Sequence, residues 1–222
     1  MSSSILLIIG SPRLRTSNSY SIAHYINQGL EKHGWNTEVI FAHKAFTSEE
    51  SICELIKKTQ NVSVIGIIFP LYVDSIPGPL GHVLDRLCEN PQQNNNTKKI
   101  FTIVNQGFPE PHQSDLAVKI IEQFTREYQA TFIGGYTIGA GGVIGRMPID
   151  QIKHRSKRLV KALDLTIQSL HQHQSLSDEA QQLLSKPLFP KSLYLFFGDM
   201  SWKKQARKYG VKNLYQKPDK QI

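Results

Sequence analysis

Five short apolar segments alternate with five helix-like segments over residues 3–170, and this alternation limits the possible folds more than any other feature of the chain. The first and third apolar segments read SSILLII and VSVIGIIF, as expected of strands buried on both faces of a sheet. The sequence predicts strands over residues 3–9, 37–41, 62–69, 99–105 and 131–137. It predicts helices over residues 17–33, 48–58, 80–88, 114–128 and 148–170. Because right-handed crossovers place helices on both faces, this order indicates a parallel sheet.

Five strands in such a sheet predict a three-layer α/β fold of the flavodoxin-like type, with strand order 2-1-3-4-5. We expect this domain to occupy residues 1–175, and residues 176–222 to form a basic C-terminal extension that contains an aromatic cluster. Ligands of doubly wound sheets bind beyond the carboxyl ends of the strands, at the switch point between strands one and three. The loops that follow the strands are therefore the places to look for function.

Composition excludes several classes of protein. Hydrophobic residues make up 40% of the 222 residues, enough to bury one core. Residues 1–9 lack the basic region and the longer apolar run of a secretion signal, so we expect a cytoplasmic protein without a membrane-spanning helix. Cys53 and Cys88 occur without a CxxC motif or a nearby His, so neither a disulfide scaffold nor a metal site is expected.

The positive charge is concentrated at the C-terminus. Residues 186–222 hold nine Lys or Arg and two Asp, a net charge of +7, which leaves +1 for the first 185 residues. The domain is therefore not expected to bind nucleic acid. For the extension, three possibilities remain: a helix packed on the domain or on a second subunit, weak contact with an anionic membrane surface, or contact with an acidic redox partner.

The loop after the first strand reads GSPRLRTSNS over residues 10–19 and predicts a phosphate site. Its hydroxyl and amide side chains precede a helix whose first backbone N–H groups are unpaired. It matches neither the Walker pattern nor GxGxxG, so a monophosphate fits better than a nucleoside triphosphate or a dinucleotide. Arg13 and Arg15 either face that phosphate or are ordinary surface arginines.

Three further loops belong to the same edge of the sheet. Residues 70–85 (PLYVDSIPGPLGHVLD) form a stiff, proline-rich loop whose backbone groups can face a planar ring. Residues 105–112 (NQGFPEPH) follow the fourth strand. Residues 138–146 (IGAGGVIGR) follow the fifth strand, and this glycine-rich segment is either a ligand contact or a flexible surface loop.

The loops after the first and the third strand carry a specific resemblance. GSPR followed by TSNS, and the pattern PLYxxSxPGxLxxxxD that begins at Pro70, resemble the flavodoxin-like NAD(P)H-dependent FMN reductase family over roughly residues 3–170. The resemblance implies FMN as cofactor, with NADPH or NADH as co-substrate. The cofactor-binding residues that it implies are Ser11, Ser17, Asn18 and Ser19 near the phosphate, Pro70, Leu71, Tyr72 and Val73 along the ring, and Asn105, Gln106 and Gly107 closing on it. Arg13, in the first of these loops, is a further candidate. Leu71 and Val73 stand where the family usually has more polar residues, so we expect a more apolar substrate pocket.

A protein of this family needs no catalytic side chain, because hydride passes from the nicotinamide to the flavin and on to a small acceptor such as a quinone or free flavin. The chain has no GxSxG or HExxH motif. The resemblance also implies a homodimer. Two rival functions remain: an electron carrier of the flavodoxin type, and a non-catalytic flavodoxin-like module for binding or sensing.

Overall fold

The computed structural model describes residues 3–90, 98–152 and 156–211. The chain forms two units, Met1–Leu188 and Phe189–Ile222. The first unit contains a sheet of five parallel strands in the order β2-β1-β3-β4-β5. The strands are β1 (Ser4–Ile9), β2 (Asn36–Phe41), β3 (Val64–Pro70), β4 (Lys99–Asn105) and β5 (Thr131–Ile138). The flavodoxin-like fold and the predicted strand order are confirmed.

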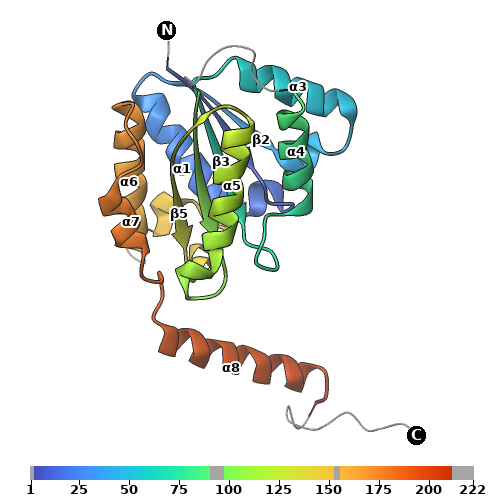
Figure 1. Cartoon of the computed structure of the whole chain (residues 1–222). Helices are drawn as coiled ribbons and strands as arrows, with labels where there is room; N and C mark the ends of the chain where they lie inside the picture. Colours follow the sequence, from blue (N-terminus) through green and yellow to red (C-terminus); the bar gives the residue numbers. More distant parts are fainter. Residues whose placement is uncertain (1–2, 91–97, 153–155, 212–222) are drawn as a thin grey trace, which may run out of the picture. The chain divides into compact units, whose positions relative to one another are not determined.

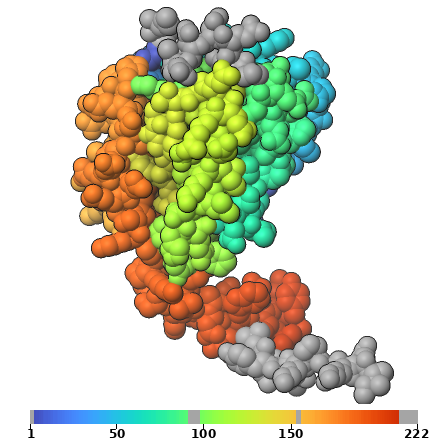
Figure 2. Space-filling model, in the orientation of Figure 1, coloured from blue at the N-terminus to red at the C-terminus, as the bar shows by residue number. Residues whose placement is uncertain are grey.

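Helices cover both faces of the sheet (Figure 1). Ile5, Leu7 and Ile9 of β1 belong to a core shared with α1 (Asn18–Lys32) and α6 (Lys157–His171). Leu6 and Ile8 belong to a second core, shared with α3 (Glu49–Gln60), α4 (Gly78–Cys88) and α5 (Asp115–Glu127). Because successive side chains of a strand point to opposite faces, the wholly apolar β1 serves both cores. In the space-filling view, α4 and α5 lie over one face of the sheet, and the orange helices α6 and α7 lie on the other side of it (Figure 2).

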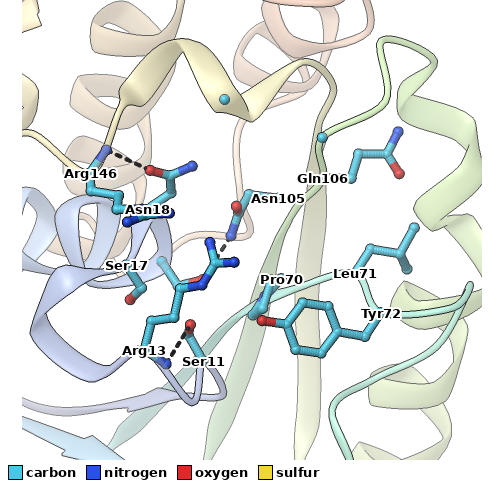
Figure 3. A pocket seen from close by; sticks show the side chains of 13 residues that line it. Ser11, Arg13, Ser17, Asn18, Pro70, Leu71, Tyr72, Asn105, Gln106 and Arg146 are labelled. Atoms are coloured by element: carbon cyan, nitrogen blue, oxygen red, sulfur yellow. Dashed lines mark hydrogen bonds between the residues drawn. The ribbon is translucent and has the colours of Figure 1, made fainter. Parts of the chain in front are cut away.

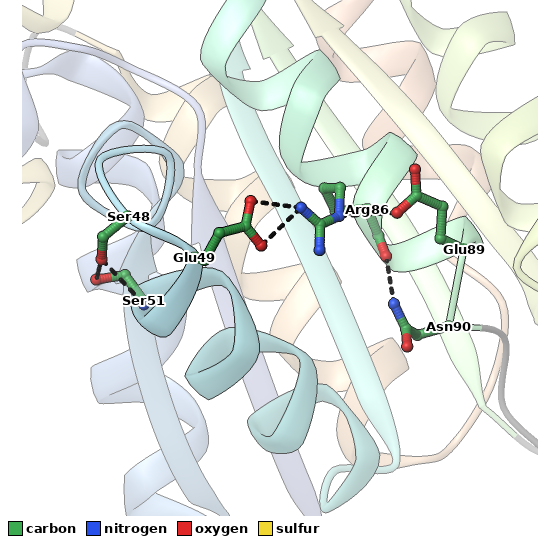
Figure 4. Close-up of polar contacts among 6 residues, drawn as sticks. All are labelled: Ser48, Glu49, Ser51, Arg86, Glu89 and Asn90. Atoms are coloured by element: carbon green, nitrogen blue, oxygen red, sulfur yellow. Dashed lines mark hydrogen bonds and ion pairs between the residues drawn. The ribbon is translucent and has the colours of Figure 1, made fainter.

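An ion pair joins α3 to α4, the helix that follows the loop after β3. The Arg86 guanidinium donates to both carboxylate oxygens of Glu49, at 2.6 and 2.7 Å, and lies 2.8 Å from Glu89 (Figure 4). Arg86 lowers the pKa of the Glu49 carboxyl, mainly by donating this hydrogen bond. Both contacts to Glu49 come from one nitrogen, Arg86 Nη1, and they link α3 to α4 behind the loop.

One predicted helix began too early, and one short helix was not predicted. The helix predicted over residues 148–170 begins at Lys157, and the short 3-10 helix Ile149–Ile152 precedes it. Ile149 and Ile152 are both buried, and their spacing of three suits a 3-10 turn as well as an α-helix, so periodicity could not separate the two. Sequence reasoning also missed the four-residue helix α2 (Ala42–Ala45).

The domain extends beyond its predicted end at residue 175. Helix α7 (Asp178–Leu184) packs on α6 and β5, and Leu176, Ala180 and Leu184 are buried in the first core. The Tyr136 hydroxyl donates to the Ser177 carbonyl oxygen at 2.8 Å, and the Leu188 N–H donates to the Gly139 carbonyl oxygen at 3.0 Å. The second unit therefore begins at Phe189, and its helix is α8 (Lys191–Lys208). In the described part of the chain, no helix combines the length and the apolar character that crossing a membrane requires.

Lys98, immediately before β4, is a buried lysine that caps a helix. Its Nζ donates to the Thr59 carbonyl oxygen in the last turn of α3 and to the Val62 carbonyl oxygen, which is 2.7 Å away. Burial lowers the pKa of this ammonium group from 10.5 to about 8. Between these two values the unfolded chain holds a proton that the folded chain has released, so stability rises with pH.

Replacing Lys98 by Met is expected to remove that pH dependence. In the unmodified protein the contribution of Lys98 to the free energy of unfolding rises from pH 8 towards pH 10.5, and the variant lacks it. Urea unfolding at pH 8 and at higher pH measures the difference, with exposed Lys119→Met as the control. An equal pH slope in Lys98→Met and the unmodified protein would contradict the assignment.

Candidate functional site

A hollow of about 230 Å³ lies at the carboxyl ends of β1, β3 and β4 (Figure 3). This is the edge at which ligands of doubly wound sheets bind. Larger hollows, of about 450 and 530 Å³, lie along the helices instead. The lining comprises Ser11, Arg13, Ser17, Asn18, Ser19, Pro70, Leu71, Tyr72, Asn105, Gln106, Gly107, Gly142 and Arg146.

The N-terminus of α1 forms one wall. The Ser17 hydroxyl caps the helix by accepting from the Tyr20 N–H at 3.1 Å, and it donates to the Leu14 carbonyl oxygen at 2.6 Å. Its hydrogen-bonding capacity is therefore largely used within the loop. Among the described residues, the backbone N–H groups of Asn18 and Ser19 have no partner. Unpaired N–H groups and the positive end of the helix dipole together make an anion site.

Two serine hydroxyls can also donate into the hollow. Ser11 accepts from the Arg13 N–H at 3.3 Å, and Ser19 accepts from the Asn105 side chain at 2.7 Å. Each serine thus keeps its own hydroxyl proton for another acceptor. Both side chains are buried, with 2% and 1% of their surface exposed, so these donors are fixed in place.

The Asn18 side chain joins α1 to the glycine-rich loop after β5. Its Nδ2 donates to the Gly141 carbonyl oxygen at 2.9 Å, and its Oδ1 accepts from the Arg146 N–H at 2.8 Å. Sequence reasoning treated Asn18 as a phosphate donor, whereas here its amide holds a second loop against the pocket. The short 3-10 helix Gly141–Ile144 lies between these two contacts.

Hydrogen bonds from the buried side chains of Asn105 and Gln106 hold the loop after β4 in place. Asn105 Nδ2 donates to the Phe69 carbonyl oxygen at 3.1 Å as well as to Ser19. Gln106 Oε1 accepts from the Ser114 hydroxyl at 2.7 Å, and its Nε2 donates to the Glu110 carbonyl oxygen. In Figure 3 the Gln106 side chain points away from the other lining side chains. Gln106 can therefore offer a ligand its backbone rather than its amide.

Two guanidinium groups enter the pocket from different loops. Arg13 comes from the loop after β1 and Arg146 from the loop after β5, and Figure 3 shows both side chains extending into the hollow. Among the described residues, neither forms an ion pair, and no Asp or Glu lines the hollow. An arginine fork without a carboxylate partner suits a phosphate dianion.

The opposite wall is apolar and stiff. The Leu71 N–H donates to the Asn105 carbonyl oxygen at 2.9 Å, which extends the pairing of β3 with β4 into the loop. Tyr72 and Ser75 exchange backbone hydrogen bonds at 3.0 Å and close a tight turn. Val73 lies at the tip of that turn with 97% of its surface exposed, and it does not line the hollow. The expected apolar shelf therefore consists of Pro70, Leu71 and the Tyr72 ring.

Left-handed backbone conformations gather in these loops. Leu14, Val73, Asp74, Ala140 and Arg146 have φ between 48° and 62°, a range that non-glycine residues rarely adopt. One lies after β1, two after β3 and two after β5. Such conformations persist only where surrounding contacts enforce them, and they cluster at binding sites.

The structure brings eleven of the twelve predicted cofactor-binding residues into one lining, and the exception is Val73. Sequence reasoning did not select Gly142 and Arg146, although both lie in the glycine-rich loop that it left undecided. The sequence did offer a topological signal, because the loop after the fifth parallel strand lies at the same edge of the sheet as the loops after the other strands. Arg146 is the one charged residue of that loop.

Known proteins resemble this chain in family and in fold. The model of the family described as NADPH-dependent FMN reductase matches residues 3–142. No curated protein matches the sequence. Among solved structures, an NADH:FMN oxidoreductase in its apo form is 17% identical to this chain. The match covers 86% of this chain and 98% of that chain, with a TM-score of 0.55.

Two further structures share the fold at similar distance. The Trp repressor binding protein from Bacillus subtilis is 16% identical and covers 75% of this chain and 96% of its own, with a TM-score of 0.54. An FMN-dependent NADH-azoreductase from Bacillus anthracis, solved with FMN, is 11% identical and covers 76% of this chain and 100% of its own, with a TM-score of 0.51. At these identities the likeness concerns the fold alone.

Proposed function

Because the chain belongs to the NADPH-dependent FMN reductase family, we propose that it carries hydride from a nicotinamide nucleotide through FMN to a small acceptor such as a quinone or free flavin. Membership makes the chain an NAD(P)H-dependent oxidoreductase with FMN as its cofactor. The observation that carries the proposal is the pocket itself, in which unpaired helix N–H groups and two free guanidinium groups face a stiff apolar wall.

The residues present fit the phosphate of FMN. We assign it to the N–H groups of Asn18 and Ser19, the hydroxyls of Ser11 and Ser19, and the Arg13 guanidinium. Charge-assisted hydrogen bonds of this kind are about twice as strong as neutral ones. Arg146 adds a second positive charge to the same pocket. The absence of acidic residues from the described lining leaves this charge uncompensated until an anion binds.

The flavin ring fits the opposite wall, where Pro70, Leu71 and Tyr72 offer apolar surface and backbone groups. When bound, FMN supplies the hydride chemistry, accepting from the nicotinamide and donating to the acceptor. The chain's residues hold the ring in place and exclude water from its inner side. The hollow is smaller than the roughly 300 Å³ of common ligand pockets. A bound cofactor therefore extends to the mouth, where a second molecule can meet it.

The described lining contains no His, Asp, Glu, Lys or Cys, and Tyr72 is its one side chain of a type used in general acid–base catalysis. This supports a mechanism in which the protein positions the reactants and the cofactor performs the chemistry. Donor and acceptor then use the same open face in turn, which predicts ping-pong kinetics.

An electron carrier of the flavodoxin type is the second candidate. It would bind FMN through the same phosphate loop but exchange electrons with protein partners. The nearly neutral charge of the first 185 residues favours the enzyme, because such carriers are typically acidic.

We also propose that the protein forms a homodimer, since Tyr72 and Phe108 expose aromatic surface near the mouth of the pocket. We propose a cytoplasmic location as well, which suits the free thiols of Cys53 and Cys88.

Incubating the purified protein with FMN or FAD, and then with NADPH or NADH, tests the proposal. We expect FMN to be retained, and the visible absorbance of bound FMN to be bleached by a nicotinamide nucleotide and restored by a quinone. FMN that stays oxidised with both nucleotides would favour the electron carrier. Failure to retain FMN would contradict the site assignment.

A further inference from the structure

We propose that α8 attaches this protein to an anionic lipid bilayer, with the apolar first half of the helix inserted into one leaflet and the basic second half lying against the headgroups. The second unit of the chain, Phe189–Ile222, contains this helix. The proposal rests on the distribution of side chains along α8 and is independent of the enzyme's acceptor.

The first half of α8 exposes large apolar side chains on several sides. Leu193, Leu195, Phe196, Phe197 and Met200 each have 44% to 59% of their surface exposed. At 3.6 residues per turn, Leu193 and Leu195 lie about 160° apart around the helix axis. No residue of α8 is buried. Phe196, Met200, Leu193 and Phe197 share an arc of about 100°, and Leu195 lies beyond it. The acyl chains of one leaflet can cover this broad apolar face and Leu195 together.

The second half of α8 is basic. Lys203, Lys204, Arg207 and Lys208 lie within six residues, and the helix has one acidic residue, Asp199, which pairs with Lys203 at 2.6 Å. Residues 186–222 carry a net charge of +7. Basic residues close to an anionic leaflet each contribute about 1 kcal/mol of attraction. Charge complementarity therefore selects anionic lipid over a neutral surface.

Trp202 marks the boundary between the two halves. It stands two residues after Met200, precedes Lys203, and has 66% of its surface exposed. Tryptophan concentrates at the interface between the hydrocarbon core and the headgroups. Residues 193–202 span about 15 Å as a helix, half of the roughly 30 Å hydrocarbon thickness. This length suits insertion into one leaflet rather than passage across the membrane.

A second copy of this chain is another occupant to consider. Dimerisation through α8 would bury the apolar side chains but would bring two basic halves together in a parallel pair. In an antiparallel pair, the basic half of each helix would lie against the apolar half of its partner. A bilayer satisfies both halves at once, because its apolar core and anionic surface are adjacent layers.

Co-sedimentation of the full chain with vesicles tests the proposal. We expect binding to phosphatidylcholine vesicles that contain phosphatidylglycerol, much weaker binding to phosphatidylcholine alone, and release at high salt. Phe196→Ser with Phe197→Ser should abolish binding, whereas exposed Phe46→Ser in the domain should not. Lys203→Gln with Lys204→Gln should weaken binding about 30-fold. Lys32→Gln with Lys57→Gln removes the same charge from the domain and should have little effect.

Tryptophan fluorescence gives a second readout. The chain has two tryptophans, and Trp35 is buried in the domain with 5% of its surface exposed. Insertion should therefore shift the emission of Trp202 to shorter wavelength, and Trp202→Phe should remove the shift while vesicle binding persists. Equal binding by the Phe196 and Phe197 double variant would overturn the proposal. So would a dimer that depends on these residues, forms without lipid and leaves vesicles unbound.

Discussion

Replacing Asn18 by Ala is expected to weaken FMN binding by up to about 30-fold while leaving the fold intact. The variant loses two hydrogen bonds, to the Gly141 carbonyl oxygen at 2.9 Å and from the Arg146 N–H at 2.8 Å. Each is worth about 1 kcal/mol, and together they hold the loop after β5 against the pocket. Fluorescence titration of the apoprotein with FMN measures the change.

A double-mutant cycle with Arg146→Ala separates two explanations for that loss. If Asn18 acts by holding Arg146 in place, Asn18→Ala costs less affinity when the Arg146 guanidinium is already gone, and the two effects do not add. If Asn18 turns its amide to donate to the phosphate directly, the two losses add. The structure predicts the first outcome, since both polar atoms of the Asn18 side chain are already engaged.

Asn27→Ala is the matched control. Asn27 lies on the same helix, and its amide donates to Glu31 at 2.8 Å, away from the pocket. It should bind FMN as the unmodified protein does. Unchanged FMN affinity in Asn18→Ala, with an unchanged circular dichroism spectrum, would show that the loop after β5 does not contribute to cofactor binding.

The Asn18 contacts also show which part of the site lay beyond sequence reasoning. The strand order and the loops that meet at one edge follow from buried strands that alternate with helices. Within those loops, the family resemblance and the polar residues of the first loop indicated eleven of the lining residues. What a side chain does within its loop depends on partners far along the chain. Asn18 meets Gly141 and Arg146 across more than a hundred residues, and no local pattern encodes that meeting.

Gln106 and Val73 illustrate the same limit. Both stand at positions where the family resemblance implies a ligand contact, yet Gln106 turns its amide towards Ser114 and Val73 turns outward at the tip of a tight turn.

Sequence reasoning also placed the end of the domain too early, because the last helix of the domain is short. Helix α7 has seven residues, and its buried Ala180 and Leu184 are too few to give a recognisable periodic pattern.

Replacing Gly139 by Ala is expected to lower the melting temperature by about 6–12 °C and to weaken FMN binding. Gly139 follows β5, where backbone hydrogen bonds draw two loops together: Ala140 N–H to Phe108 O at 2.7 Å, and Gly141 N–H to Gln106 O at 2.7 Å. A Cβ at position 139 would overlap the Pro109 carbonyl oxygen and lie 3.0 Å from its carbonyl carbon. Backbone atoms cannot turn aside as a flexible side chain can.

The added methyl group must therefore separate the loops that follow β4 and β5. Overpacking of this kind costs about 3 kcal/mol at the upper end of its usual range. For a domain of this size, each kcal/mol lowers the melting temperature by roughly 2–4 °C. The same separation moves Gln106, Gly107 and Arg146 away from the pocket, so FMN affinity should fall together with stability.

Gly78→Ala provides the comparison, because a Cβ at Gly78 meets no atom within 4 Å and the residue lies outside the pocket lining. Thermal denaturation of both variants, with and without FMN, measures the effect. Since FMN stabilises the folded protein more when it binds more tightly, the same concentration of FMN should raise the melting temperature of Gly139→Ala less than that of Gly78→Ala. If both variants melt together and gain equally from FMN, the loops after β4 and β5 are not held at Gly139, and the pocket owes its shape to other contacts.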